Sequence, residues 1–209
     1  MEDVLRVYQL PYDSDYPQVC LDETNKQLIG EVCPPLPGQP GQPYRYESHY
    51  LRAGVSQLFL WYEPLTGRRH VAVRDHKGAV DWAEVIAELL EVHYPTAQKV
   101  RLVMDQLNTH AGGSLYQAFA PAPARALYER LEIHYTPKHG SWLNMAEMEL
   151  SVVARQCLDR RIPDLTTLRR EVQVWEETRN AAVVKVDWQF TTADARVKLK
   201  KLYPTIELQ

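Results

Sequence analysis

Residues 100–110 of the chain read VRLVMDQLNTH, a short apolar run that ends in a carboxylate and passes into polar residues. Followed by Ala111-Gly112-Gly113, the pattern predicts a buried strand that runs out into a loop. In proteins built of strands and helices, ligands bind where strands pass into loops at their carboxyl ends. Asp105 is therefore a candidate site residue, although a strand that simply ends in a polar turn explains a lone aspartate equally well.

A second stretch has the same form. Residues 18–24 read QVCLDET, again a short apolar run that ends in an acid. Two strands that each deliver an aspartate to one edge of a sheet would place Asp22 beside Asp105. Like charges at that distance are costly unless something positive lies between them, and a divalent cation held by oxygen ligands is the usual solution.

A third acid comes from residues 141–150, SWLNMAEMEL, which predict the start of a helix that continues to about residue 160. At 3.6 residues per turn, Glu147 falls on one stripe with Leu143 and Leu150, while Glu149 projects to nearly the opposite side. An inward carboxylate is expensive unless it is paired or binds a metal. Glu147 is therefore predicted to complete the acidic site.

A capping box is the alternative interpretation of this helix start. Asn144 stands three residues before Glu147, and in a capping box the two side chains close the first turn of the helix against each other. In that case Glu147 has no role beyond the helix terminus.

Composition sets the broad class. The chain has 209 residues, 45% of them hydrophobic and 24% charged, which suits one large globular domain. We expect no membrane association, because no apolar run is long enough to span a bilayer. Three cysteines without metal-ligand spacing and no signal-peptide pattern favour a cytoplasmic location. The net charge of −3 argues mildly against DNA binding, although basic residues cluster near 155–170 and 196–201.

The predicted element order indicates an α/β fold. Residues 1–17 form a lead-in and linker, and 18–209 one domain with a Pro/Gly-rich insertion at 24–53 and C-terminal helices at 164–209. The remaining elements are strands 54–62, 70–74, 100–104 and 132–135 and helices 79–93, 114–119, 124–131 and 141–160. This order matches a ribonuclease H-like fold, a mixed five-stranded sheet with a three-strand antiparallel meander and two parallel strands, flanked by helices. In that fold the first and fourth strands are neighbours, so Asp22 and Asp105 would meet.

Three motifs then carry a family resemblance. CLDET at 20–24, VMDQLNTH at 103–110 and YTPKHGSWLNMAE at 135–147 resemble the DDE transposases of the insertion sequence 630 group, in the mariner superfamily. The resemblance implies that Asp22, Asp105 and Glu147 are the catalytic and metal-binding acids. It further implies two Mg²⁺ or Mn²⁺ ions per site when DNA is bound, cleavage at transposon ends, and transfer of the 3′-OH strand into target DNA at TA.

The resemblance also implies roles around the acids, and it has two departures. Lys138 and His139 would contact DNA phosphates, although a solvated loop lysine and a structural histidine explain these two residues equally well. Asn108 and His110 would brace the loop after Asp105. Family members commonly have Asn where this chain has Gln106, a neighbour that would orient the carboxylate or a metal-bound water. They also carry N-terminal helix-turn-helix domains, which are not found here. The 24–53 segment would reach a second protomer in a homodimer.

Three other functions remain open. A metal-dependent nuclease of the same fold would cut DNA without strand transfer. A catalytically inactive DNA-binding or assembly module is the second, given Gln106 and the expected lack of a head domain. A hydrolase of sugars or phosphates that uses paired acids without metal is the third.

Overall fold

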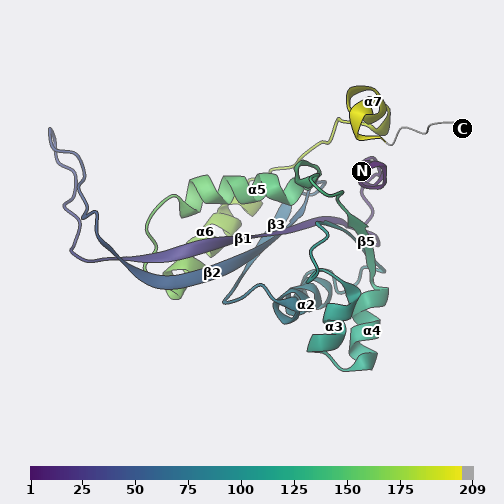
Figure 1. Cartoon of the computed structure of the whole chain (residues 1–209), viewed down its shortest axis with the longest axis horizontal. Coiled ribbons are helices and arrows are strands. Elements are labelled where there is room, and N and C mark those ends of the chain that lie inside the picture. Colours follow the sequence, from purple (N-terminus) through teal and green to yellow (C-terminus); the bar gives the residue numbers. More distant parts are fainter. Residues whose placement is uncertain (204–209) are drawn as a thin grey trace, which may run out of the picture.

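A five-stranded mixed sheet forms the centre of the molecule, as shown by a computed structural model that describes residues 1–203 (Figure 1). The strand order is β3-β2-β1-β4-β5. β1 pairs antiparallel with β2 and β2 with β3, whereas β4 runs parallel to both β1 and β5. The predicted ribonuclease H-like architecture is confirmed. The strands are β1 (Gln18–Glu31), β2 (Tyr50–Glu63), β3 (Arg68–Arg74), β4 (Val100–Met104) and β5 (Leu131–Tyr135).

Helices cover both faces of this sheet (Figure 1). None of the helices within residues 1–203 is long and apolar enough to cross a membrane. The α-helices are α1 (Glu2–Tyr8), α2 (Ala79–Glu88), α3 (Gly112–Ala118), α4 (Pro121–Glu129), α5 (Met145–Val153), α6 (Leu165–Ala181) and α7 (Thr192–Lys198). Two π-helical turns, η1 (Leu89–His93) and η3 (Ala154–Leu158), and two 3₁₀ turns, η2 (Ser141–Leu143) and η4 (Lys200–Leu202), complete the set.

The alternation of β1 divides its side chains between two hydrophobic layers. Cys20 packs with α1, α5 and α6 on one face, and Leu21 packs with α2 on the other. Because successive strand residues point to opposite faces, Asp22 follows Cys20 toward the α5 face and Glu23 follows Leu21 toward the α2 face.

Both ends of the segment predicted as an insertion, 24–53, belong to the β1–β2 ladder. β1 and β2 remain paired as far as Glu31 and Tyr50, with an irregularity between Gln27 and Ile29. Only residues 32–49 lie beyond the ladder, and they form a projecting arm (Figure 1). The prediction overestimated the loop because its Pro residues, and its Gly residues apart from Gly30, are confined to 34–43, and residues on either side extend the two strands.

The predicted lead-in belongs to the folded domain. Val4 and Leu5 of α1 are fully buried in the α5 layer, and the Tyr8 hydroxyl donates to the Leu143 carbonyl at 2.6 Å. α7 packs against α1, and Arg196 bonds both carboxylate oxygens of Glu2 at 2.7 Å. Residues 204–209 of the predicted C-terminal helical region lie outside the described residues.

Candidate active site

The two aspartates leave neighbouring parallel strands in the same register. Cys20 of β1 pairs with Val103 of β4, and each aspartate stands two residues further on. Asp22 is thus still within β1, while Asp105 is the first residue after β4. The predicted meeting of these two acids at one sheet edge follows directly from this pairing.

Helix α5 brings the third acid to the same edge. Its N-cap is Asn144, whose side-chain oxygen accepts from the Ala146 amide at 3.1 Å. The side-chain amide nitrogen of Asn144 donates to the Leu21 carbonyl at 2.8 Å, and this bond connects the helix start to the residue before Asp22. Within residues 1–203 no capping box closes this helix, so the carboxylate of Glu147 is left for the site.

Burial and the carboxylates around it shift the pKa of Asp22. The pKa of Asp22 is raised to about 7, chiefly by burial and to a smaller extent by the neighbouring charges of Glu23, Asp105 and Glu147, against a bond from the Glu23 amide that favours the ionised form. The carboxylates of Asp105 and Glu147 therefore both lie within range of electrostatic repulsion of Asp22. A divalent cation among them would relieve it.

Without metal, the raised pKa of Asp22 predicts that the stability of the fold depends on pH. The folded pKa of about 7 lies above the ordinary value of 3.8, so the folded state holds the Asp22 proton more tightly than the unfolded chain. The stabilisation is complete below about pH 4 and is lost as the pH rises through 7. Urea unfolding in EDTA should show a larger loss of stability between pH 5 and 8 for the wild type than for Asp22→Asn. Equal losses of stability in the two proteins would show that the pKa of Asp22 is not raised in the folded state.

The predicted orientation of α5 is wrong in one respect. Glu147 is exposed at the surface, whereas Glu149 is buried with 3% of its surface accessible. Leu143 belongs to the separate 3₁₀ turn η2, so its position does not set the phase of the helix. The buried stripe of α5 consists instead of Met145, Ala146, Glu149, Leu150 and Val153.

Glu149 anchors the helix rather than facing away from the sheet. Arg179 of α6 bonds both of its oxygens at 2.8 Å, and Arg69 Nε of β3 lies 3.2 Å from Oε2. The Arg69 guanidinium also stacks on Tyr62, 5.0 Å from the ring centroid. This buried ion cluster fixes α5, and with it Glu147, to β3 and α6.

His110 connects Asp105 to an acid that sequence reasoning missed. Its Nδ1 lies 2.6 Å from Asp105 Oδ1, and its Nε2 lies 3.4 Å from Glu23 Oε2. The ring is 2% exposed and stacks on Trp82, while the Tyr135 hydroxyl donates to the His110 carbonyl at 2.8 Å. The sequence could have indicated Glu23 by its position directly after Asp22, because the next residue of a strand points to the opposite face of the sheet.

We predict that His110→Ala weakens Mn²⁺ binding about 10- to 100-fold, the usual effect of removing a partner that orients a metal ligand. His110→Asn should recover part of the loss, because its amide can still donate to Asp105. Isothermal titration with Mn²⁺ measures both affinities. Glu91→Gln, an exposed change outside the acidic site, is the control and should bind as the wild type does. Equal losses in His110→Ala and His110→Asn would count against orientation of Asp105.

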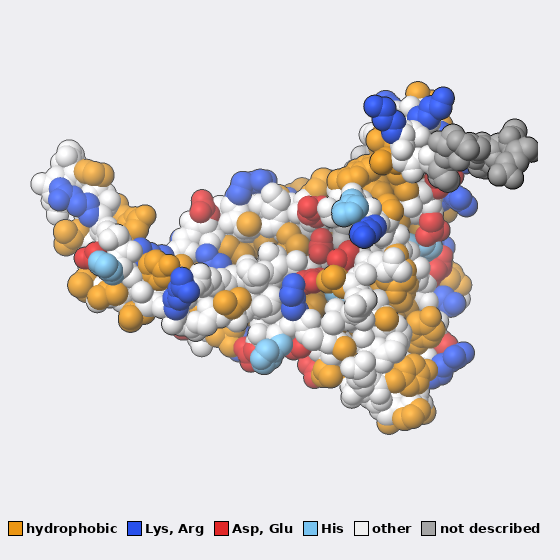
Figure 2. Space-filling view, viewed as in Figure 1, with side chains coloured by type: hydrophobic (Ala, Val, Ile, Leu, Met, Phe, Trp, Pro, Cys, Tyr) orange, Lys and Arg blue, Asp and Glu red, His pale blue; other side chains and the backbone are white. Residues whose placement is uncertain are grey.

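A cleft of about 360 Å³ opens beside Asp105. Gln106, Lys138 and His139 line it, and Lys138 and His139 are exposed. His139 has a φ of 62°, a left-handed conformation that costs a residue with a side chain about 1–2 kcal/mol. Strained backbone persists where the surroundings hold it and clusters at functional sites. On the face of the molecule drawn in Figure 2, acidic side chains gather near the middle, beside a histidine and a basic side chain.

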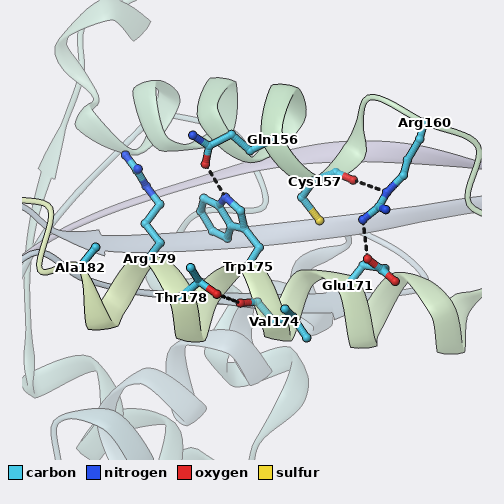
Figure 3. Close-up of a pocket in the computed structure, with 9 residues that line it drawn as sticks. All are labelled: Gln156, Cys157, Arg160, Glu171, Val174, Trp175, Thr178, Arg179 and Ala182. Atoms are coloured by element: carbon cyan, nitrogen blue, oxygen red, sulfur yellow. Dashed lines mark hydrogen bonds and ion pairs between the residues drawn. The ribbon is translucent and has the colours of Figure 1, made fainter.

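Another pocket, between η3 and α6, has a different character (Figure 3). The indole N–H of Trp175 donates to Gln156 at 3.0 Å, and Arg160 pairs with Glu171. Arg179 is held by Glu149. These polar groups are occupied by one another, so the pocket presents no comparable acidic group to a substrate.

The donor set of the acidic site suits a hard cation. Asp22, Asp105 and Glu147 offer carboxylate oxygens, which Mg²⁺ and Mn²⁺ prefer over nitrogen or sulfur. Glu23 Oε2 is buried and accepts no hydrogen bond from residues 1–203. Both ring nitrogens of His110 already face carboxylates, which suits a brace better than a ligand.

Comparison with known proteins identifies the family and the fold. Residues 17–169 match the family model described as "DDE superfamily endonuclease". Among solved structures the fold is similar to the Mos1 mariner paired end complex with Mn (TM-score 0.52, 11% identity) and to the Mos1 transposase paired-end complex with left transposon end (0.56, 12%). It is also similar to the Mos1 Strand Transfer Complex (0.52, 13%).

The alignments with the Mos1 structures cover a larger share of this chain than of the Mos1 chains. The three alignments cover 88%, 89% and 96% of this chain but only 59%, 58% and 58% of the Mos1 chains. The chain thus spans less than two thirds of the length of those proteins. A search of curated proteins found no match to the sequence.

Proposed function

Because the chain belongs to the DDE superfamily endonuclease family, we propose that it is the catalytic domain of a DNA transposase. It cleaves phosphodiester bonds at transposon ends and transfers the freed 3′-OH strand into target DNA, at TA dinucleotides. The observation that carries the proposal is the parallel register that sets Asp22 beside Asp105, together with the effect of the Asp105 and Glu147 charges on Asp22. The motif at 135–147 supports membership of the insertion sequence 630 group.

The acids divide the work between them. When metal is present, Asp22 and Asp105 would hold two Mg²⁺ or Mn²⁺ ions, and Glu147 would hold one of the two. When bound, such a pair activates the attacking oxygen and stabilises the leaving oxygen of an in-line displacement. His110 keeps the Asp105 carboxylate in place from behind, with Glu23 holding the far side of its ring.

The cleft beside Asp105 supplies the DNA contacts. Lys138 and His139 are exposed there, so they can reach phosphate oxygens next to the scissile bond. Gln106 lines the same cleft and orients the attacking water or hydroxyl by hydrogen bonding. Asn108 is exposed and lies outside that lining, so its part is limited to the loop that carries His110.

A homodimer through the 32–49 arm is part of the proposal. The arm and its base expose Leu36, Tyr44, Tyr46 and Leu51, apolar surface that a partner chain would cover. At the base, Arg161 lies over the rings of Tyr46 and Tyr50. This packing joins the base of the arm to the segment after η3.

A strand-transfer assay tests the function. Duplexes with 3′-OH ends, taken from the DNA that flanks the gene, are incubated with the full chain, Mn²⁺ and a supercoiled plasmid. The proposal expects joined products with insertions at TA. Plasmid nicking without joining would identify a nuclease of the same fold, and binding of Mn²⁺ without nicking or joining would identify an inactive assembly module.

A further inference from the structure

A second cluster of ligand-type side chains lies on the edge strand, remote from the aspartates. His70 of β3, Glu88 of α2 and His93 of η1 bring one ligand atom each within 4.8 Å of the others. His70 Nε2 lies 3.3 Å from Glu88 Oε1, and His93 Nε2 lies 4.0 Å from the same oxygen. One carboxylate oxygen therefore faces two imidazole nitrogens.

A π-helical turn creates this arrangement. Glu88 and His93 are five residues apart, and in an α-helix such residues point well away from each other. In η1 the Tyr94 amide bonds the Leu89 carbonyl, an i→i+5 bond. The wider turn carries His93 round to the side of Glu88. Single π turns of this kind are rare and occur frequently at functional sites.

Neighbouring groups leave the three atoms available. Arg74 bonds Glu88 Oε2 at 2.7 Å, which leaves Oε1 directed at the histidines. Glu176 of α6 lies 3.0 Å from His70 Nδ1, the partner that fixes a histidine whose other nitrogen binds metal.

We propose that His70, Glu88 and His93 form a binding site for one transition-metal ion of the Zn²⁺ class. Two imidazoles and a carboxylate are a zinc donor set, unlike the all-oxygen set of the aspartates. Tetrahedral ligands at about 2.0–2.1 Å from zinc stand about 3.3–3.4 Å apart, the separation of His70 and Glu88. The fourth position opens into a groove of about 600 Å³ lined by all three residues.

Binding requires two adjustments. The His93 ring must close toward the ion, because its 4.0 Å contact with Glu88 is longer than a tetrahedral edge. The exposed Arg68 guanidinium, 3.4 Å from His93 Nδ1, must turn away, because that nitrogen carries a proton once Nε2 binds metal.

The site is distinct from the acidic one. His70 pairs across the sheet with Trp61, which pairs in turn with Leu21, so two strand spacings separate the backbones of His70 and β1. A bound ion would join the edge strand β3 to α2 and, through Glu176, to α6. An ion that binds only the folded chain raises its stability by mass action.

The experiment must separate this site from Glu23, Asp105 and His110, a second group whose ligand atoms also lie within 4.8 Å. Zn²⁺ is titrated calorimetrically into the full-length Asp105→Asn chain after treatment with EDTA. We expect one Zn²⁺ to bind per chain. Adding His70→Gln or His93→Gln should lower its affinity by more than tenfold, and adding Glu176→Gln by about tenfold.

Two matched controls and one direct readout complete the test. His76→Gln changes an exposed histidine just after β3, and His134→Gln changes a histidine held by Asp3 and Glu132; neither should alter Zn²⁺ binding. Circular dichroism melts without metal show whether each variant folds. In the wild-type chain, ring-nitrogen NMR should show Zn²⁺ shifting His70 and His93. Loss of all Zn²⁺ binding in Asp105→Asn, or full affinity in a folded His93→Gln chain, overturns the proposal.

Discussion

Glu147→Gln is expected to abolish metal-dependent DNA cleavage while leaving the fold intact. Glutamine has the same size but no charge, so it cannot replace the carboxylate of a hard-cation ligand. Stabilisation of a phosphoryl centre by metal is worth several kcal/mol, and about 4 kcal/mol corresponds to a thousandfold loss of rate. Because Glu147 is exposed and forms no capping box within the described residues, its loss should not affect folding.

The measurement is the rate of Mn²⁺-dependent nicking of supercoiled DNA, with circular dichroism as the check on folding. Glu91→Gln, an exposed change outside the acidic site, is the control and should nick at the wild-type rate. A Glu147→Gln chain that nicks within tenfold of the wild type would exclude Glu147 as a metal ligand.

Glu149→Gln should have the opposite effect, a loss of stability instead of a direct loss of chemistry. The Arg69 side chain is fully buried and that of Arg179 is 17% exposed, and both depend on the Glu149 charge. Removing one partner from a buried ion pair costs about 3–5 kcal/mol, because the remaining charge stays buried without compensation. Urea unfolding measures the change, and a loss below 1 kcal/mol would contradict the structural role.

A double variant separates charge from packing. Combining Glu149→Met with Arg69→Met replaces the buried pair with apolar groups, a change that is often neutral or stabilising; it leaves only the 17% exposed Arg179 without its partner, whereas Glu149→Gln also leaves the fully buried Arg69. The double variant should therefore be more stable than Glu149→Gln. Below their unfolding transitions, both should still bind Mn²⁺, because neither changes Asp22, Asp105 or Glu147.

The sheet and its order were predictable from local patterns. Apolar runs at 18–21 and 100–104 indicated strands, and the succession of elements identified the neighbours of β1. The extents of β1 and β2 were not predictable, because the outer half of their hairpin has little burial to impose a pattern: Tyr50, Leu51 and Val55 are all exposed. Such a ladder depends on backbone pairing, which composition does not reveal.

The site was predictable only in part, for two physical reasons. Asp22 and Asp105 stand at strand ends, where chain order sets the geometry. Glu147 was chosen as the third acid from its motif, but its orientation was not predicted, since helical phase was counted through a 3₁₀ turn at Leu143. Glu149 and Glu23 lie within or beside buried clusters whose partners come from distant elements, and no local pattern shows such contacts.

The parallel pairing of β1 with β4 has a consequence for the order of folding. β1, β2 and β3 are successive antiparallel strands, so their pairing closes the shorter loops of the sheet. Cys20 of β1 pairs with Val103 of β4 only after the chain has passed through β2, β3 and α2. Closing that longer loop costs more entropy, and non-local contacts form more slowly. We expect pulse-labelled hydrogen exchange to protect the β1–β3 amides before those of β4. A nascent chain would then carry Asp22 on a formed meander with no second acid beside it, and cleavage activity would arise only once the last layer has docked.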